Sequence, residues 1–210
     1  MYRLAELSDS RRKGIGWAMV GFGTLLLAVA VWWIHFSSFP LIEVVDGVEL
    51  EVVLSSFNWV PRGWLWKSIG YLAAFGASQM MLGGASLLWV LNQKMTWSRG
   101  MFAAFLAWIE LLLLFGIVPS EWLNLAQTDL DWSSQRVALT IPPFLVLGNE
   151  IEISWAVVKD LISTGWHLVM IPAVAIFALQ VQRMYDGRPA AAEKPEPKSP
   201  YGRTLVKGGG

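Results

Sequence analysis

The sequence alternates between long apolar runs and shorter stretches that are polar or strand-like. The apolar runs cover residues 15–36, 69–91, 101–118 and 166–179, and the last extends to about residue 184. A helix needs about 20 mainly apolar residues to cross a hydrocarbon core roughly 30 Å thick. We therefore expect four transmembrane helices.

The second and third runs are separated only by the polar link 92–100, which predicts a transmembrane helical hairpin. Counted from this link at about 1.5 Å per residue, Gln79 and Glu110 lie at similar depths near mid-membrane. A carboxylate at that depth must be protonated, paired or turned toward a wet interior. Two interpretations stay open for this intramembrane polar pair. In the first, a protonated Glu110 packs by hydrogen bonding to Gln79 or Ser78. In the second, Glu110 is functional, either as a proton or cation site or as a hydrogen-bond partner for a quinone or another subunit.

The two ends of the chain differ in composition from the rest. Residues 1–14 are basic and precede the run 15–36, as in a signal peptide, but that run is too long for one and indicates a first membrane helix. From Arg183 the sequence is rich in Pro, Ala, Lys and Glu and ends in three glycines. Because this composition has little apolar surface to bury, we expect a transmembrane domain over residues 15–184 and a disordered tail over 185–210.

The basic residues predict the orientation in the membrane. Residues 1–14, the link 92–100 and the tail from residue 183 carry 4, 2 and 6 Lys and Arg residues, whereas the connections 37–67 and 119–165 carry 2 each. Cytoplasmic loops are enriched in Lys and Arg, so both termini are expected in the cytoplasm and both long loops outside. Tryptophans near the outer ends of the spans predict an interfacial belt made of Trp32, Trp33, Trp59, Trp64, Trp66, Trp122 and Trp166.

Each outer loop contains a strand–turn–strand signal. Asp46-Gly47 separates the runs LIEVV and VELEVV, and Gly148-Asn149 separates FLVL and EIEIS. Each signal follows a proline and precedes a Gly-Trp pair that opens the next span, with 23 residues from proline to that pair in the first loop and 22 in the second. We expect two β-hairpins, the first with a type I′ turn, in a tandem repeat of helix, β-hairpin and helix.

The second copy has about twenty additional residues, 119–139, in which SEWLNLAQTDL is expected to form a short helix on the outer surface. Because isolated two-stranded hairpins are marginally stable, we expect the four strands to join. The predicted fold is an all-α membrane bundle of four transmembrane helices, with two extracytoplasmic β-hairpins forming a small sheet.

Two histidines form a second candidate site. His35 ends the first span and His167 begins the fourth, so both are expected at the outer interface, where two helices can ligate one haem b. The repeat argues against this site. In the first copy, the position that matches His167 is occupied by Leu65, so the histidine is not a feature of both copies. We therefore expect no cofactor, with a haem- or quinone-binding anchor as the alternative. The chain has no cysteine, and we expect neither a metal site nor catalytic residues.

Small residues along the second span predict close helix packing. Gly76, Ala77, Gly83 and Gly84 form this stripe, and they are accompanied in the first span by several glycines. Such stripes let backbones approach closely and are typical of helix contacts in membranes.

The layout of four spans with an outer sheet resembles that of the claudins, and residues 63–66, Gly-Trp-Leu-Trp, are similar to part of the claudin motif. The cysteine pair that completes that motif is absent, so the resemblance is limited to layout and implies no family membership.

These features favour an accessory or structural subunit of a prokaryotic inner-membrane complex, which we expect to belong to electron transport. The expected partners are the lipid bilayer and other membrane subunits, and no stripe of basic residues indicates nucleic acid. The expected location is the inner (plasma) membrane, with several spans. The alternatives are the haem or quinone anchor and a small transporter or proton-conducting protein that uses Glu110.

The orientation is tested by single cysteines introduced into the cysteine-free chain. Cysteines at Asp46 and Asn149 should react with an impermeant thiol reagent added outside, and cysteines at Gln93 and Ser98 in the link should not. Labelling of the link from outside would reverse the predicted orientation.

Overall fold

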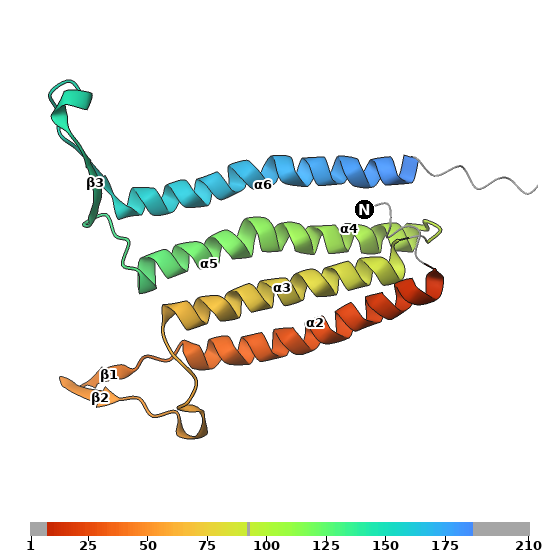
Figure 1. Ribbon diagram of the computed structural model, residues 1–210, viewed down its shortest axis with the longest axis horizontal. Helices are drawn as coiled ribbons and strands as arrows, with labels where there is room; N and C mark the ends of the chain where they lie inside the picture. Colours follow the sequence, from red (N-terminus) through yellow and green to blue (C-terminus); the bar gives the residue numbers. More distant parts are fainter. Residues whose placement is uncertain (1–7, 92, 187–210) are drawn as a thin grey trace, which may run out of the picture. The chain divides into compact units, whose positions relative to one another are not determined.

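The computed structural model describes residues 8–91 and 93–186 and is mainly helical (Figure 1). Its elements are α2 (Asp9–Ser37), β1 (Ile42–Val45), β2 (Val48–Glu51), the 3-10 turn η1 (Ser55–Phe57), α3 (Trp64–Trp89), α4 (Trp97–Leu112), the π-helical stretch η2 (Leu113–Ile117), α5 (Val118–Asn124), the π-helical stretch η3 (Leu125–Asp129), β3 (Val137–Ile141), the 3-10 turn η4 (Pro143–Leu145), β4 (Ile151–Ser154) and α6 (Trp155–Asp186).

Within the described residues, four helical stretches are long and apolar enough to cross a membrane. They are α2, α3, the continuous helix from α4 through η3, and α6 as far as Gln182. The prediction of four such helices is confirmed. The predicted disordered tail lies outside the described residues, except for its first two residues, which end α6.

The chain divides into two compact units, Met1–Leu168 and Val169–Gly210. The boundary falls inside α6, at Leu168. In a regular helix the Leu168 carbonyl would accept a hydrogen bond from the N–H group of residue 172. Pro172 has no N–H group, so this helical hydrogen bond cannot form. All contacts described below belong to the first unit, and the described part of the second unit is the rest of α6.

The α2–α3 pair is packed through small residues that recur every seven positions. Both helices bury them along one stripe: Gly16, Gly23, Ala30 and Ser37 on α2, and Gly70, Ala77 and Gly84 on α3. Because the helices run antiparallel, the first small residues of α2 meet the last ones of α3. Gly16 lies opposite Gly84, and Gly23 lies opposite Ala77. A seven-residue repeat is the spacing that keeps one stripe of each helix in contact in a left-handed coil.

Backbone approaches backbone along this stripe. A Cβ atom added to Gly84 would lie 2.8 Å from the carbonyl oxygen of Gly16, and one added to Gly23 would lie 3.0 Å from that of Ala77. At the hairpin end of the pair, the Gly63 N–H donates to the Ser37 carbonyl at 3.2 Å. The contact therefore tolerates almost no increase in side-chain volume.

Arg12 closes the other end of the α2–α3 pair. Its side chain is 1% exposed, and its guanidinium donates to the carbonyl of Leu87, to the carbonyl of Leu91 at 2.9 Å, and to Asp9. The last carbonyls of a helix lack partners within it, so a buried arginine that reaches them acts as a C-terminal cap. In the sequence, Arg12 counts only as one basic residue among those that predict orientation.

The third helix is longer than predicted. Residues of SEWLNLAQTDL continue it through α5 and η3 to Asp129, so the separate surface helix was wrong. Pro119 does not end the helix, because the π-helical η2 precedes it: the Val118 N–H donates to the Leu113 carbonyl five residues earlier. The wider π-turn relieves the clash between a proline ring and the preceding turn that a regular helix would impose.

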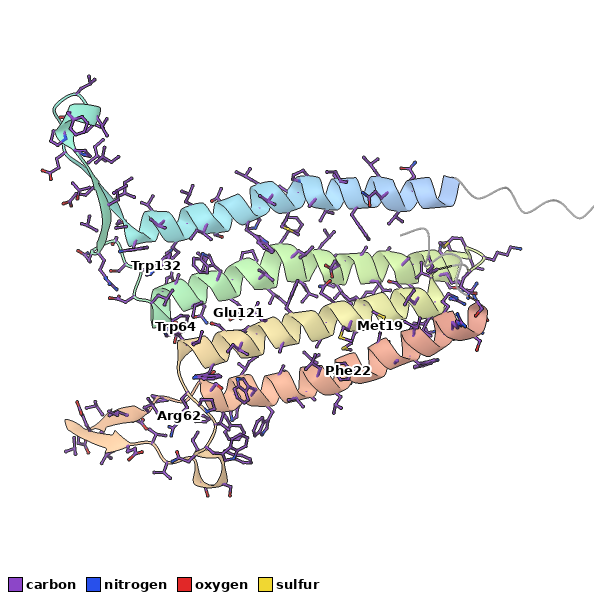
Figure 2. The ribbon with its side chains drawn as sticks, in the orientation of Figure 1. Met19, Phe22, Arg62, Trp64, Glu121 and Trp132 are labelled. Atoms are coloured by element: carbon purple, nitrogen blue, oxygen red, sulfur yellow. The ribbon has the colours of Figure 1, made fainter. Side chains whose placement is uncertain are left out.

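The first hairpin has the predicted register. β1 and β2 pair antiparallel with Val45 opposite Val48, and the turn residues Asp46 and Gly47 have φ angles of 53° and 77°. Two successive positive φ angles define the type I′ turn. Arg62 fastens the base of this hairpin by donating to the carbonyls of Pro40 at 2.9 Å and Val52 at 2.8 Å (Figure 2).

The second hairpin differs from the prediction. β3 is the run Val137–Ile141, paired with β4, whereas FLVL contributes a 3-10 turn. Two consecutive prolines, Pro142 and Pro143, remove the N–H groups that a strand would need here. The positive φ angles fall on Leu147 (55°) and Gly148 (86°), one residue earlier than predicted.

The two hairpins form separate two-stranded sheets, so the predicted joint sheet was wrong. Each hairpin is held by hydrogen bonds within its own loop, to Arg62 in the first and to Arg136 in the second, where Arg136 donates to the carbonyls of Leu130 and Asp131 at 3.2 Å. In the part of the chain that the structure describes, no strand of one hairpin pairs with the other.

The repeat therefore holds in element order but not in detail. Gly63 and Trp64 open α3 as predicted. Gly165 and Trp166 do not open the fourth helix, because α6 begins at Trp155 and continues directly from β4.

The stripe gives a direct test by two equivalent substitutions on α3. Gly84→Ala should destabilise the protein by about 1–3 kcal/mol, because the added methyl group meets the Gly16 backbone. Gly76→Ala should be neutral or stabilising by up to about 1 kcal/mol, because Gly76 has no described neighbour within 4 Å and alanine favours helix. Unfolding with sodium dodecyl sulfate in mixed micelles measures both. Equal stability of the two variants would contradict the tight packing.

Candidate functional site

Glu110 and Gln79 come together between α4 and α3. The Gln79 Nε2 donates to Glu110 Oε2 at 2.9 Å, and both side chains are half-buried. Ser78, the other partner considered for Glu110, instead donates from its hydroxyl to the Ala74 carbonyl at 2.9 Å. Glu110 thus has a neutral hydrogen-bond donor from the adjacent helix as its partner.

Two further contacts on either side of this pair align α3 with α4 through η3. Toward the link, the rings of Trp89 and Phe102 lie edge to face with centroids 5.6 Å apart. Toward the hairpins, Lys67 Nζ lies 2.5 Å from Asp129 Oδ2. The Gln79–Glu110 pair therefore lies between these two contacts along an antiparallel helix pair.

The π-helical stretch η2 begins three residues after Glu110. A hydrogen bond joins η2 to Trp166 of α6. In a π-turn, the Leu114 carbonyl would accept from residue 119, but Pro119 has no N–H. The Trp166 indole N–H donates to this carbonyl at 2.7 Å. Trp166, expected in an interfacial belt, thereby satisfies a backbone group within the third helix, since an unpaired carbonyl in an apolar setting is costly.

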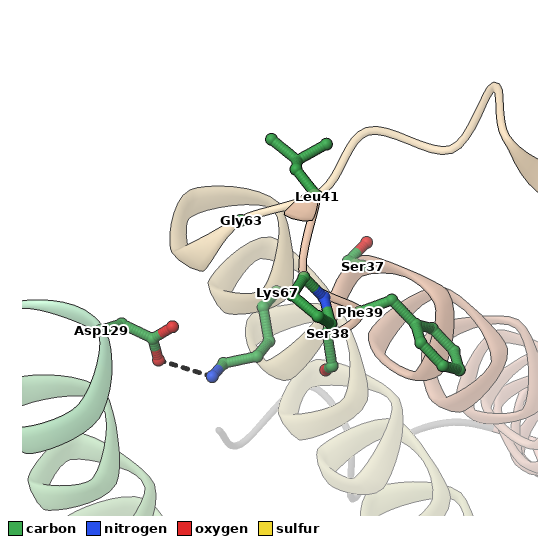
Figure 3. Close-up of a pocket in the computed structure, with 8 residues that line it drawn as sticks. Ser37, Ser38, Phe39, Leu41, Gly63, Lys67 and Asp129 are labelled. Carbon is green, nitrogen blue, oxygen red and sulfur yellow. Dashed lines mark hydrogen bonds and ion pairs between the residues drawn. The ribbon is translucent and has the colours of Figure 1, made fainter. Parts of the chain in front are cut away.

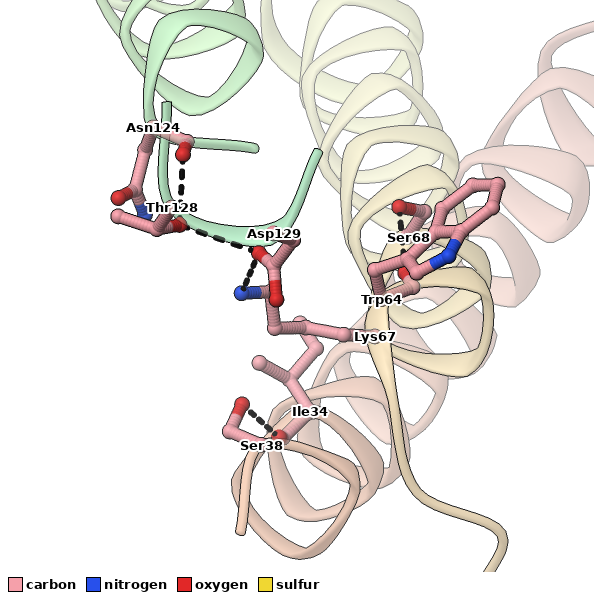
Figure 4. A network of polar contacts seen from close by, with 8 residues as sticks. All are labelled: Ile34, Ser38, Trp64, Lys67, Ser68, Asn124, Thr128 and Asp129. Carbon is pink, nitrogen blue, oxygen red and sulfur yellow. Dashed lines mark hydrogen bonds and ion pairs between the residues drawn. The ribbon is translucent and has the colours of Figure 1, made fainter. Parts of the chain in front are cut away.

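The hairpin end holds a polar network that the sequence did not reveal (Figure 4). Asp129 accepts from Lys67 and from the Thr128 hydroxyl at 3.2 Å, and that hydroxyl also lies 2.7 Å from the Asn124 carbonyl. The side chains of Lys67 and Asp129 are only 14% and 25% exposed. Both belong to segments assigned to outer loops, 62 residues apart, so sequence spacing gave no reason to pair them.

A pocket of about 260 Å³ lies beside this ion pair (Figure 3). Its lining consists of Ser37, Ser38, Phe39, Pro40, Leu41, Gly63, Lys67 and Asp129. Ser37 is 1% exposed, and its hydroxyl has no hydrogen-bond partner among the described residues. Because Lys67 and Asp129 neutralise each other, the pocket is polar without a net charge from this pair.

The two histidines have different surroundings. His35 lies in the last turn of α2, with its ring centroid 5.1 Å from that of Phe36 and 5.2 Å from that of Phe39. His167 lies inside α6 and not at the start of a span; its ring centroid is 5.9 Å from that of Phe115, and its Nδ1 is 2.7 Å from the Ser163 carbonyl oxygen. A carbonyl only accepts, so Nδ1 carries the proton in this arrangement.

The two axial ligands of one haem iron must lie at nearly the same level along the helices. Counted at about 1.5 Å per residue from the contacts that align the helices, His35 and His167 differ in level by more than about 10 Å. The structure therefore does not bring the two histidines together.

The four small residues of the predicted packing stripe lie on different faces of α3. Ala77 and Gly84 are buried against α2, and a Cβ on Gly83 would lie 3.1 Å from Met19 Cε. Gly76 has no described neighbour within 4 Å. Gly16, Gly23 and Gly70, by contrast, belong to the contact. Gly16 and Gly23 are seven residues apart, as are Gly70 and Ala77, and this spacing is the signal that identifies them in the sequence.

The described residues contain no group of three or more His, Cys, Asp or Glu side chains able to hold a metal ion. Comparison of the chain with family models, with curated proteins and with solved structures found no match.

A double-mutant cycle tests the role of Glu110. Glu110→Gln retains size and hydrogen-bonding capacity and should keep most of the stability, whereas Glu110→Leu leaves Gln79 unpaired and should cost about 0.6–2 kcal/mol. Gln79→Leu should cost a similar amount, and the double variant should cost less than the sum, because the two side chains share one interaction. Unfolding in mixed micelles measures the wild type and these four variants. Additive effects would contradict a direct pair.

Proposed function

We propose that the protein is an accessory, non-catalytic subunit of a larger prokaryotic inner-membrane complex, and that this complex belongs to electron transport. The observation that carries the proposal is the apolar surface that both hairpin loops expose outside the four candidate spans. Large aliphatic and aromatic side chains there are more than half exposed: Leu41, Val44, Val53, Phe144, Leu145 and Leu147.

An exposed apolar side chain has a different environment in a loop than in a membrane-spanning helix. Apolar side chains on the surface of a membrane-spanning helix are solvated by lipid tails. Apolar side chains in a loop beyond the membrane face water, where large exposed patches mark sites of protein contact. A subunit that docks through its loops accounts for this surface, whereas a self-contained transporter or haem anchor has no need of it.

The polar groups within the spans support a structural role. Glu110 is hydrogen-bonded to Gln79, and the indole of Trp166 is hydrogen-bonded to the Leu114 carbonyl. Both interactions join one helix to another, which is the function of polar side chains in helix packing. The electron-transport part of the proposal is an association with a class of complex, because small polytopic subunits with few polar groups are found in such complexes.

The proposal is tested by the size of the particle that contains the chain. The affinity-tagged protein, extracted from its native membranes in mild detergent, should migrate as part of a particle several times larger than the purified chain in the same detergent. That particle should show cytochrome absorbance. A chain that migrates alone from native membranes would contradict the proposal.

The same material separates the haem alternative. After a harsher detergent dissociates the particle, the released chain should show no Soret band, and His35→Ala and His167→Ala should leave the particle and its spectrum unchanged. A Soret band in the isolated chain that either substitution abolishes would instead support the haem-binding anchor.

A further inference from the structure

We infer that the β3–β4 hairpin is the docking element of this subunit, and that its partner is a protein surface on the same side of the membrane carrying an apolar patch with a basic rim. This inference rests on the proposed function and identifies both the contact and the chemistry of the partner. The hairpin can be followed in Figure 1, where it leads into α6.

One face of the hairpin is aliphatic throughout its paired region. Residues directly opposite each other in an antiparallel pair share a face, as do residues two apart in one strand. Leu139 pairs with Ile153 and Ile141 pairs with Ile151, so these four side chains lie on one face. The other face carries the pair Thr140 and Glu152. The hairpin thus has one apolar and one polar face.

The tip of the hairpin adds exposed apolar side chains. Phe144 is 82% exposed, Leu145 is 65% exposed and Leu147 is 99% exposed. Leu147 also has a φ angle of 55°, in the left-handed region that glycine and asparagine adopt more readily. A leucine side chain that is almost fully exposed in this conformation gains little from burial against the described residues of the hairpin. Its side chain is placed for a contact with another molecule.

The charge around this surface selects a protein over a lipid surface. Residues 137–158 contain no lysine or arginine, and Glu150 and Glu152 belong to β4 or adjoin it. Segments that insert into membrane surfaces carry basic residues that attract anionic lipids. The acidic hairpin is repelled by such lipids, and a partner with basic residues around an apolar centre complements it.

The first hairpin provides a matched comparison within the chain. One face of the first hairpin carries Glu43 and its strand partner Leu50. The other face carries Glu49 and Glu51, which pair across the strands with Val44 and Ile42. Both of its faces therefore carry carboxylates, and it lacks the continuous apolar face of the second hairpin. Val48, which is 58% exposed, serves as a control position there.

Site-specific photo-crosslinking of the full-length chain in native membranes tests the contact. A benzoylphenylalanine placed at Phe144 or Leu139 should give a discrete adduct with one other protein. The same group at Thr140, on the polar face, or at Val48 should give much less of it. Adducts with lipid alone, adducts with a second copy of the chain, or equal yields from both faces would overturn the inference.

Substitutions test the chemistry of the partner. Glu150 and Glu152 lie on the polar face of the hairpin, so they act on the basic rim of the partner through their charge and not by direct contact. Glu150→Lys together with Glu152→Lys should therefore lower the yield of the Phe144 adduct by about threefold or more, because the rim of the partner and the hairpin would then carry like charges. Phe144→Glu together with Leu147→Glu should release the chain from its native particle, whereas Val48→Glu should not. These tip residues are exposed, and unchanged unfolding in mixed micelles would verify that the variants retain their fold.

The outcomes separate this inference from the proposed function. If the wild-type chain belongs to a large particle but the tip and charge substitutions leave particle and adduct unchanged, the docking inference fails and the accessory role stands. If the wild-type chain forms neither a large particle nor a protein adduct, both fail.

Discussion

The structure depends on the close approach of α2 and α3. Carbonyl groups of one helix lie against glycine Cα atoms of the other, so this contact is governed by shape and admits few alternatives. Between helices in lipid, dispersion at short range is the main attraction, because lipid tails are as apolar as the helix surface and no hydrophobic effect drives the helices together. The contact fixes the register of the two helices, and the Arg12 cap and the Gly63–Ser37 hydrogen bond complete it at its two ends.

Once α2 covers one side of α3, the remaining side presents the groups that position the third helix. Lys67 and Gln79 lie twelve residues apart on α3, and they meet Asp129 and Glu110 in turn. Polar contacts at separated levels define the register of a helix pair more sharply than lipid-facing apolar residues can. The Gln79–Glu110 hydrogen bond resembles in its geometry the polar contacts that specify register in coiled coils.

The third helix also shows how one proline is accommodated in a helix that is long and apolar enough to cross a membrane. Pro119 removes a hydrogen-bond donor, the π-turn η2 redistributes the neighbouring hydrogen bonds, and Trp166 from α6 supplies a donor to the carbonyl left over. The helix remains continuous into a region that the sequence assigned to an outer loop. The hairpins, in contrast, are held by arginines within their own loops, and many of their apolar side chains stay exposed.

The sequence alone determined the features that follow from local chemistry: four long apolar helices, the type I′ turn at Asp46-Gly47, and the start of α3 after Gly63. It also placed Gln79 and Glu110 at similar depths, because a short link fixes the relation between two consecutive helices. Tertiary structure decided what depends on contacts distant in sequence. Two prolines displaced a strand from FLVL to VALTI, η2 carried the third helix past Pro119, and Lys67 met Asp129 across 62 residues. The two hairpins stayed separate because each is fastened within its own loop, and strand pairing between loops is not encoded in the local pattern of either one.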